Sequence, residues 1–326
     1  MNARISGIAS YAPEDILDNE MLSKMVDTND EWITTRVGIK ERRILKKPGE
    51  GSSYLGEQAV KKLLESTGTK PEEVDLLICA TSNPDYRFPS TGSVIAHRCG
   101  LKNAYAYDIQ AACAGFLVAL QDGSAYVRSG LRKKVVVVAA EMMSSMVNYK
   151  DRSTCPLFGD AAGAMLLEPT DKNVGIIDGV FHVDGDGRDH LIMPAGGSVK
   201  PASHETIDAN EHYVIQDGRY VFKHAVTDMV DSTLAVMEQN GLSVEDVDWV
   251  VPHQANLRII DSVSQHLGIP DSKVLVNIEH YGNTSAASIP LCLDEYKDRL
   301  KAGDRIILTA FGAGFTWGSL YIIWDI

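Results

Sequence analysis

The sequence predicts an internally duplicated α/β protein with mostly parallel sheets, and three observations support this fold class. Uninterrupted apolar runs at residues 135–140 and 305–310 are typical of strands that are covered on both faces. Leu55, Ala59 and Leu63 recur at helical spacing before such a run. The third observation is an internal repeat of the same order of elements. An alternation of strands and helices implies parallel strands joined by crossover helices.

The repeat has a constant offset of 173 residues. The matching segments are residues 54–67 with 227–240, residues 68–79 with 241–252, and residues 111–120 with 284–293. One offset shared by three separate elements favours a duplication over chance matches. We therefore predict an N-terminal half over residues 1–172 and a C-terminal half over residues 173–326.

Each half is expected to contain helix, buried strand, helix, strand, helix and strand in this order. Residues 1–8 already have the pattern of a strand. Near the end of each half, a strand leads through Phe-Gly and small residues into another strand, at residues 158–167 and 311–320. Residues 184–218 are rich in Gly, Asp, His and Pro. We expect this least regular stretch to form a surface excursion between the halves.

Composition is that of a soluble globular protein. A chain of 326 residues with 44% hydrophobic and 23% charged residues can bury a substantial core. No apolar run approaches the roughly 18 residues of a membrane span, and the N-terminus lacks a signal-peptide core. Five scattered cysteines without metal-ligand spacing indicate reduced thiols, a cytoplasmic location and no metal site. A net charge of −13 argues against nucleic-acid binding.

Three segments carry side chains suited to catalysis. Cys113 stands between a short β-like run and an apolar helical pattern, where a helix start favours the nucleophilic thiolate. His253 and Asn283 follow strands of the second half, in Pro252-His-Gln-Ala-Asn256 and in the small-residue segment 281–288. Ligands of parallel α/β sheets bind beyond the carboxyl ends of strands, so these three side chains can meet at the seam between the halves.

The chemistry suited to this set is acyl transfer followed by condensation. A thiol can accept an acyl group from a thioester, which gives an acyl-enzyme and ping-pong kinetics. Neutral donors on His253 and Asn283 can hold an enolate oxygen without quenching the carbanion. Taken singly, each residue also has a structural interpretation: a buried core cysteine, a core histidine, and a turn asparagine beside Gly282. The joint pattern favours the catalytic interpretation.

These segments also resemble those of the β-ketoacyl-acyl carrier protein synthase III family. The resemblance runs from residues 29–38 to residues 311–318, and His253-Gln-Ala-Asn-Leu-Arg258 and Gly282-Asn-Thr-Ser-Ala-Ala-Ser288 are its specific motifs. It implies a thiolase-like fold with α/β/α/β/α layers. It also implies decarboxylative condensation of a short acyl-CoA, expected to be acetyl-CoA, with malonyl-acyl carrier protein at the start of fatty acid biosynthesis. A homodimer without a cofactor is implied as well.

The resemblance assigns further site residues. Phe311, Ala313 and Gly314 correspond to the oxyanion and active-site wall, where the family often has glycine at position 313. The coenzyme A contacts would be Trp32, Arg36 and Arg152, with aromatic and guanidinium groups holding the adenine. Carrier-protein docking would involve Gln254, Ala255, Asn256, Leu257, Arg258 and Lys223. The chain departs from the family at Gln265 and His266, where a basic pair is common. Phe88 would limit primer length by capping the pocket of a partner subunit.

Other functions fit the sequence less well. Papain-like proteases also use Cys, His and Asn, but Ala111-Ala-Cys113-Ala-Gly-Phe116 does not match their cysteine motif. Thiolases share the duplicated fold but need a second catalytic cysteine late in the chain, and Cys292 lies in an apolar helical pattern instead. A related enzyme of secondary metabolism with another acyl donor or acceptor remains an alternative, and a non-enzymatic binding module is a distant one. The sequence does not identify the primer.

Overall fold

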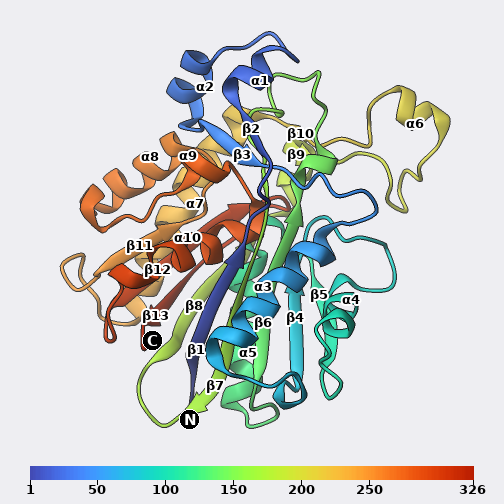
Figure 1. Cartoon of the computed structure of the whole chain (residues 1–326). Coiled ribbons are helices and arrows are strands. Elements are labelled where there is room, and N and C mark those ends of the chain that lie inside the picture. The colour runs from blue at the N-terminus through green and yellow to red at the C-terminus, as the bar shows by residue number, and fades with distance from the viewer.

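One nine-stranded mixed sheet runs through the molecule in the computed structural model, which describes residues 1–326 (Figure 1). The strands are β1 (Asn2–Tyr11), β2 (Ile16–Asp18), β3 (Glu41–Arg43), β4 (Leu76–Ala80), β5 (Tyr105–Ile109), β6 (Val135–Met142), β7 (Asp160–Thr170), β8 (Gly175–Val183), β9 (Leu191–Ile192), β10 (Ile215–Gln216), β11 (Trp249–Pro252), β12 (Arg305–Gly312) and β13 (Thr316–Ile323). The helices are α1 (Asn19–Ser23), α2 (Asp30–Val37), α3 (Ser52–Thr67), α4 (Thr91–Arg98), α5 (Gly115–Arg128), α6 (His204–Asp208), α7 (Gly218–Gln239), α8 (Leu257–Leu267), α9 (Ile278–Tyr281) and α10 (Ser288–Tyr296). None of these helices combines the length and apolar character needed to cross a membrane.

The order of the strands repeats in the two parts of the sheet. The order is β11-β12-β13-β8-β1-β7-β6-β4-β5, so β8 mirrors β1 and β13-β12-β11 mirrors β7-β6-β4. A parallel bridge joins Val250 of β11 to Val274. Val274 therefore lies beside β11 in the position that β5 occupies beside β4. The two parts join where β1 pairs with β8 at Ala3 and Ile176. The boundary proposed between residues 172 and 173 lies in the turn between β7 and β8.

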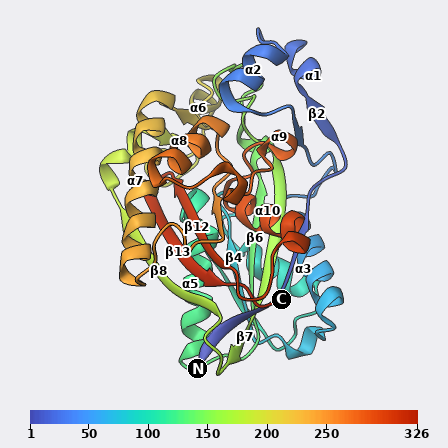
Figure 2. The same ribbon diagram turned by 90° about the vertical axis from the view of Figure 1, so that its left-hand side faces the viewer.

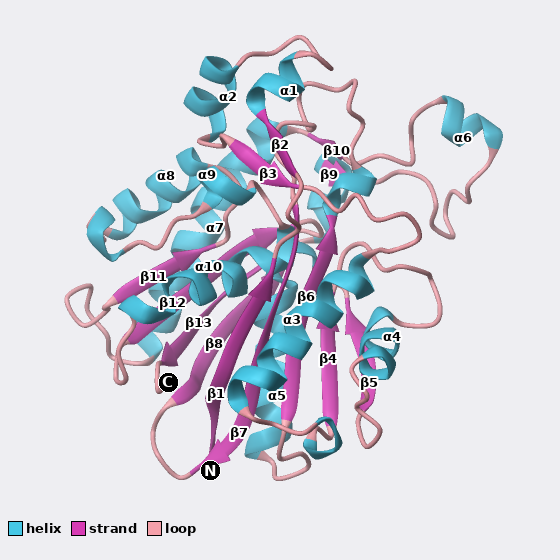
Figure 3. Ribbon diagram, in the orientation of Figure 1, coloured by secondary structure: helices cyan, strands magenta, loops and turns pink.

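Parallel and antiparallel pairing occupy different parts of this sheet. β4 pairs in parallel with β5 and β6, and β11 pairs in parallel with β12. The strands between them, β6-β7-β1 and β12-β13-β8, pair antiparallel. The predicted duplicated α/β fold is therefore confirmed, with its parallel strands in the outer parts of the sheet. Their carboxyl ends run toward the same region in the upper middle of the view (Figure 3).

Helices divide the molecule into layers. α5 and α10 begin at Gly115 and Ser288, 173 residues apart, and both pack in the central layer against strands of both halves. α3 covers the outer face of β1, β6 and β7, while α7 covers β12 and β13 and packs against α8 (Figure 2). The layers therefore follow the predicted order. Outer helices cover one half of the sheet, the central helices α5 and α10 lie between the two halves, and outer helices cover the other half.

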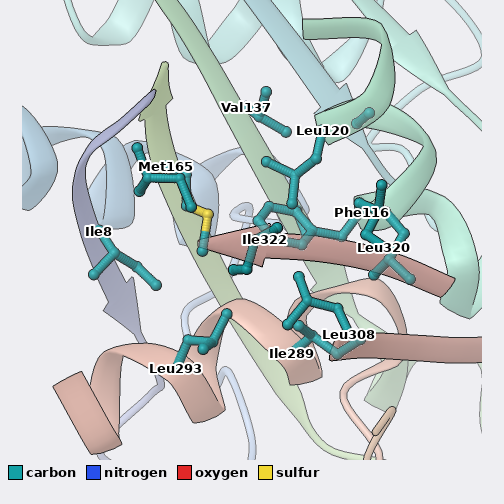
Figure 4. Close-up of a cluster of buried hydrophobic side chains, with 14 of the residues drawn as sticks. Ile8, Phe116, Leu120, Val137, Met165, Ile289, Leu293, Leu308, Leu320 and Ile322 are labelled. Atoms are coloured by element: carbon teal, nitrogen blue, oxygen red, sulfur yellow. The ribbon is translucent and has the colours of Figure 1, made fainter. Parts of the chain in front are cut away.

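The central layer contains the largest core, a cluster of 34 buried residues. In Figure 4, Phe116 and Leu120 of α5 point toward the same space as Ile289 and Leu293 of α10, with Leu308 of β12 beside them. Burying each such side chain contributes roughly 1.5–3 kcal/mol. The first turns of α5 and α10 are thereby held in fixed positions, and both carry candidate site residues.

The irregular stretch of residues 184–218 differs in part from its prediction. α6 and its flanking loops project from the body of the molecule, as expected of a surface excursion (Figure 1). Residues 191–193 and 195–197, however, line a cavity of about 1200 Å³. Leu191 also packs against two buried clusters. One contains residues of α7 and α8, and the other contains Ile33. This stretch is therefore partly a wall of the cavity, because its apolar residues fold back onto α7.

Candidate active site

The candidate nucleophile lies in a tight turn that occurs twice in the chain. Cys113 lies in the 3₁₀ turn η2 (Ala112–Ala114), directly before α5. The turn η6 (Ser285–Ala287) precedes α10 in the same way and packs against η2. Ala112 and Ser285 are 173 residues apart and both have positive φ, +46° and +50°. Such a conformation costs about 1–3 kcal/mol outside glycine, so the surroundings must enforce it. In the second turn, Ala286 stands at the position of Cys113.

Close packing shapes the surroundings of Cys113. A Cβ atom at Gly312 would lie only 2.6 Å from the backbone nitrogen of Cys113, so only glycine permits this approach. Burial raises the pKa of the Cys113 thiol to about 12, and the nearby charge of Glu141 acts in the same direction. A hydrogen bond from Ser285 opposes this rise. Loss of solvent contact thus favours the thiol form of Cys113, whereas the helix start favours the predicted thiolate.

His253 is a neutral imidazole fixed by Ser288. It follows β11, is buried, and burial lowers the pKa of its side chain to about 3. Its Nδ1 lies 2.7 Å from the hydroxyl oxygen of Ser288, which also accepts the backbone N–H of Gln254 at 3.3 Å. When Ser288 donates its hydroxyl proton to Nδ1, Nε2 carries the ring proton. His253 then offers an N–H donor to the cavity that it lines.

Asn283 is held by its backbone and by its own side chain. Its backbone pairs with residues 157–159, donating to Leu157 at 2.8 Å and accepting from Gly159 at 3.0 Å. Its Oδ1 accepts the backbone N–H of Ser285 at 2.8 Å. The Nδ2 group is consequently left as the free donor. Gly282 precedes it with φ +65°, and a Cβ there would lie 2.7 Å from the carbonyl oxygen of Leu157.

The three candidate catalytic residues line one cavity of about 1200 Å³. Cys113 comes from the N-terminal half, while His253 and Asn283 come from the C-terminal half, as the repeat predicts. Phe311 and Ala313 also line the cavity. Ala313 is not among the residues with positive φ, so alanine fits the position where the family often has glycine. Gly314 does not line the cavity, so its assignment to the site wall is not supported by the structure.

The charged side chains that line this cavity are all cationic. Four arginines contribute to it, Arg36, Arg87, Arg219 and Arg258, and no aspartate or glutamate does. The whole chain has a net charge of −13, so this concentration of positive charge runs against the overall composition. Guanidinium groups pair strongly with phosphate and carboxylate groups. The cavity is therefore suited to an anionic ligand.

The predicted coenzyme A contacts lie together beside the cavity. The Arg152 guanidinium lies 4.7 Å from the centre of the Trp32 ring, and that of Arg36 lies 5.6 Å from it. Arg152 also pairs with Asp27 at 3.5 Å. Trp32 and Arg36 line the cavity, and the side chain of Arg152 covers the indole directly. A purine can stack between the indole and Arg152 only after that arginine swings aside.

The predicted carrier-docking residues divide into buried and accessible groups. Gln254 is 1% exposed, and its amide bonds to backbone groups of Pro252, Leu275 and Asn277. Its assignment to docking is wrong, because a buried amide that joins the end of β11 to residues 275–277 cannot contact a partner. Leu257 is half-buried and packs against Gly38.

Ala255, Asn256 and Arg258 line the cavity, and Lys223 is exposed on α7. Asn256 also caps α8 by accepting the backbone N–H of Arg258 at 2.9 Å. These positions stay a prediction for docking. Gln265 and His266 are exposed at the end of α8.

Phe88 does not face the cavity of its own chain. Its side chain is 86% exposed, whereas the neighbouring Arg87 lines the cavity. A role in limiting primer length would therefore require a partner subunit, as predicted, and this role stays a prediction. Cys292 is buried in the core, and Cys113 is the only cysteine that lines the cavity. This arrangement does not provide the second cysteine that thiolases use.

Several site residues were missed in the sequence. Ser285 and Ser288 lie inside the Asn283-Thr-Ser-Ala-Ala-Ser288 motif, and the repeat offset could have identified Ser285 as the counterpart of Ala112. Arg87 and Arg219 are isolated basic residues in irregular segments. No local pattern distinguishes them from solvated surface arginines.

Comparisons with known proteins identify the family of the chain. Family models described as 3-oxoacyl-[acyl-carrier-protein (ACP)] synthase III and its C-terminal part match residues 107–185 and 237–324. A β-ketoacyl-[acyl-carrier-protein] synthase III of Bacteroides thetaiotaomicron is 55% identical over 324 residues, which cover 99% of this chain and 97% of the relative. A relative of the same name from Porphyromonas gingivalis W83 is also 55% identical over 324 residues, with the same coverage.

Solved structures give the same result. The 3-oxoacyl-[acyl-carrier-protein] synthase III of Aquifex aeolicus is 42% identical with a TM-score of 0.91, covering 99% of this chain and 100% of the other. A priming β-ketosynthase from the R1128 polyketide pathway is 36% identical with a TM-score of 0.91, covering 99% and 96%. The family and the thiolase-like fold predicted from the sequence are thus confirmed. The chain belongs to the β-ketoacyl-acyl carrier protein synthase III family.

Proposed function

We propose that this enzyme condenses a short acyl-CoA, such as acetyl-CoA, with malonyl-acyl carrier protein to form a 3-oxoacyl-acyl carrier protein, the initiating step of fatty acid biosynthesis. The observation that carries the proposal is the meeting of Cys113, His253 and Asn283 in one cavity lined by four arginines and no carboxylate. Both substrates carry phosphate groups next to a pantetheine thioester. A cationic cavity that ends at a thiol suits this shape and charge.

In the first half-reaction, the Cys113 sulfur attacks the thioester carbonyl carbon. The carbon–sulfur bond to coenzyme A breaks, and the acyl group remains on Cys113. The oxyanion formed on the way is stabilised by the backbone N–H groups of Cys113 and of the loop that follows Phe311. The closeness of Gly312 to the Cys113 nitrogen supports this pairing of backbone segments. Trp32, Arg36 and Arg152 hold the adenosine end of the donor.

In the second half-reaction, the malonyl group loses carbon dioxide. The electron pair of the broken carbon–carbon bond moves to the thioester oxygen, and the His253 Nε2–H and the Asn283 amide donate to that oxygen. Burial keeps the pKa of His253 at about 3, so the imidazole holds the enolate as a neutral donor and does not protonate its carbon. The enolate carbon then attacks the acyl group on Cys113, and the Cys113 sulfur leaves. The reaction needs no group beyond the two thioesters.

The carrier protein is proposed to dock at the cavity mouth near Arg258 and Lys223. Both are basic residues on an acidic chain, and Arg258 lies over the Phe222 ring at 5.6 Å. Acyl carrier proteins are acidic, so a local basic patch offers complementary charge. A homodimer, in which Phe88 reaches the partner's pocket, completes the proposed assembly.

The proposal is tested by incubating the enzyme with a panel of acyl-CoAs and malonyl-acyl carrier protein. We expect an acyl adduct on Cys113 and a 3-oxoacyl-acyl carrier protein product with short primers. The resemblance to a priming polyketide synthase supplies the competing result. Product formation only with another donor or acceptor would place the enzyme in secondary metabolism instead.

A further inference from the structure

Glu141 is a buried carboxylate to which the two half-reactions give no role. It lies at the end of β6 and is 0% exposed. Its oxygens accept the backbone N–H of Ser82 at 3.1 and 3.0 Å, the Ser82 hydroxyl at 3.1 Å, and the Thr81 hydroxyl at 3.4 Å. No cation neutralises it. An uncompensated buried carboxylate is costly, so its presence calls for a chemical explanation.

The hydroxyl of Ser285 connects this carboxylate to the nucleophile. Hydrogen bonding to Ser285 lowers the pKa of both Glu141 and Cys113, and the backbone N–H of Ala286 acts on Glu141 in the same direction. The Ser285 oxygen lies 3.3 Å from that of Ser82. Ser285 has a positive φ of +50°, and its turn η6 packs against η2. The turn that carries Ser285 thus packs against the turn that carries Cys113, and the Ser285 hydroxyl is linked to Glu141 through the Ser82 hydroxyl, which donates to the carboxylate at 3.1 Å.

The first half-reaction requires a group that accepts the thiol proton. Cys113 is a thiol at rest, since burial raises its pKa to about 12. His253 is a poor acceptor, because burial lowers its pKa to about 3 and Ser288 occupies its Nδ1. Burial raises the pKa of Glu141 to about 7, which makes it a much stronger base than an ordinary carboxylate.

We propose that Glu141 accepts the Cys113 thiol proton through the Ser285 hydroxyl, a role that rests on the proposed function of Cys113 as nucleophile. As the sulfur bonds to the thioester carbon, the thiol proton moves to the Ser285 oxygen and the Ser285 proton moves to Glu141. Coenzyme A leaves as a thiolate and is protonated by solvent. After condensation the expelled Cys113 thiolate recovers the proton from Glu141 by the same path, so the only proton drawn from solvent is the one that coenzyme A takes up.

Among the titratable groups around it, only Glu141 is suited to accept the thiol proton of Cys113. The titratable groups that face it are the thiols of Cys113 on η2 and Cys79 on β4, and burial raises the pKa of both, so both stay neutral. The turn η6 presents no titratable side chain. Asp160 on the adjacent strand β7 pairs in register with Met142 and therefore lies on the opposite face of the sheet from Glu141. Asp160 bonds instead to Leu45 and Ser144.

The pH dependence of Cys113 acylation by acetyl-CoA, followed by intact mass, tests this role. In the wild type the rate should rise through a midpoint near pH 7, the pKa of Glu141, and then level off. Glu141→Gln keeps a polar group of the same shape but cannot accept the proton. We expect it to be about 10²–10⁴-fold slower at pH 8, with no inflection near neutrality. Ser285→Ala should behave in the same way. Asp160→Asn, a matched buried carboxyl without contact to the sulfur, should keep the inflection.

A purely structural role would give a different result. If Glu141→Gln or Ser285→Ala slows acylation equally at every pH and keeps the inflection, or leaves the rate unchanged, the proposed relay is wrong. Alkylation of Cys113 by iodoacetamide provides a second readout with the same expected profiles. If no acyl-CoA acylates the wild type but alkylation shows the Glu141-dependent inflection, the proposed function fails and the relay stands. Should Glu141→Gln not fold, as judged by circular dichroism, Ser285→Ala decides alone.

Discussion

Replacing His253 by alanine should separate the two half-reactions. In the proposed mechanism the imidazole acts only after Cys113 is acylated, as one of two donors to the enolate oxygen. Loss of one such donor costs about 2.7–4 kcal/mol, which corresponds to a 10²–10³-fold fall in the rate of malonyl decarboxylation. The Asn283 amide remains as the other donor, so the substitution removes one donor of the two. Acylation of Cys113 should fall by less than about tenfold, because a buried imidazole with a pKa of about 3 is not the base.

The assay measures the two steps separately. Acylation is followed as the mass increase of the enzyme with acetyl-CoA, and decarboxylation as carbon dioxide released from malonyl-acyl carrier protein by pre-acylated enzyme. His266→Ala is the matched control, because His266 is an exposed histidine on α8 and does not line the cavity. Equal damage to both steps in His253→Ala would refute the reasoning and assign the imidazole to activation of the thiol.

The pH dependence gives an independent check on the same residue. Burial depresses the pKa of His253 from 6.5 to about 3, so the imidazole stays neutral at every pH above about 4. Decarboxylation by pre-acylated enzyme should therefore show no histidine inflection between pH 5 and 8. The sign for stability is the opposite of that for a salt-bridged histidine. The neutral buried form loses stability as the pH falls below 6.5, because the unfolded chain takes up the proton and the folded chain does not.

Three further substitutions test other parts of the site. Arg258→Glu should raise the KM for malonyl-acyl carrier protein while acetyl-CoA acylation stays nearly intact, and an unchanged KM would contradict the docking surface. Phe88→Thr should extend the accepted primers from acetyl-CoA toward decanoyl-CoA, since each added buried methylene gains roughly 0.8 kcal/mol once the pocket is open; wild-type enzyme that already uses decanoyl-CoA equally well would refute the gate. Gly312→Ala should abolish Cys113 acylation, because the new Cβ would lie 2.6 Å from the Cys113 nitrogen, whereas Gly185→Ala, where nothing lies within 4 Å, should be unaffected.

The parts of the fold that could be predicted from the sequence are those with a repeating pattern. The 173-residue offset, read from apolar runs, located α5 and α10 and the meeting of Cys113 with residues of the second half. The antiparallel centre of the sheet was not predicted. Strands buried on both faces are uniformly apolar, so periodicity carries no information on their direction.

Side-chain burial was the main source of error within the site. Gln254 stands in a family motif and was assigned to docking, yet it is 1% exposed and joins Pro252 to residues 275–277. Cys113 was expected as a thiolate because a helix follows it, but burial raises its pKa to about 12. Both errors have the same cause. Burial depends on residues distant in the sequence, such as Gly312 beside Cys113, which no local pattern brings together.

The most direct test of the central claim is the identity of the acylated atom after a single turnover with labelled acetyl-CoA. Peptide mapping of wild-type enzyme should place the acetyl group on Cys113, and the label should move to the 3-oxoacyl product when malonyl-acyl carrier protein is added. Cys113→Ala should carry no label and form no product. A stable label on another residue, or full product formation by Cys113→Ala, would contradict the account.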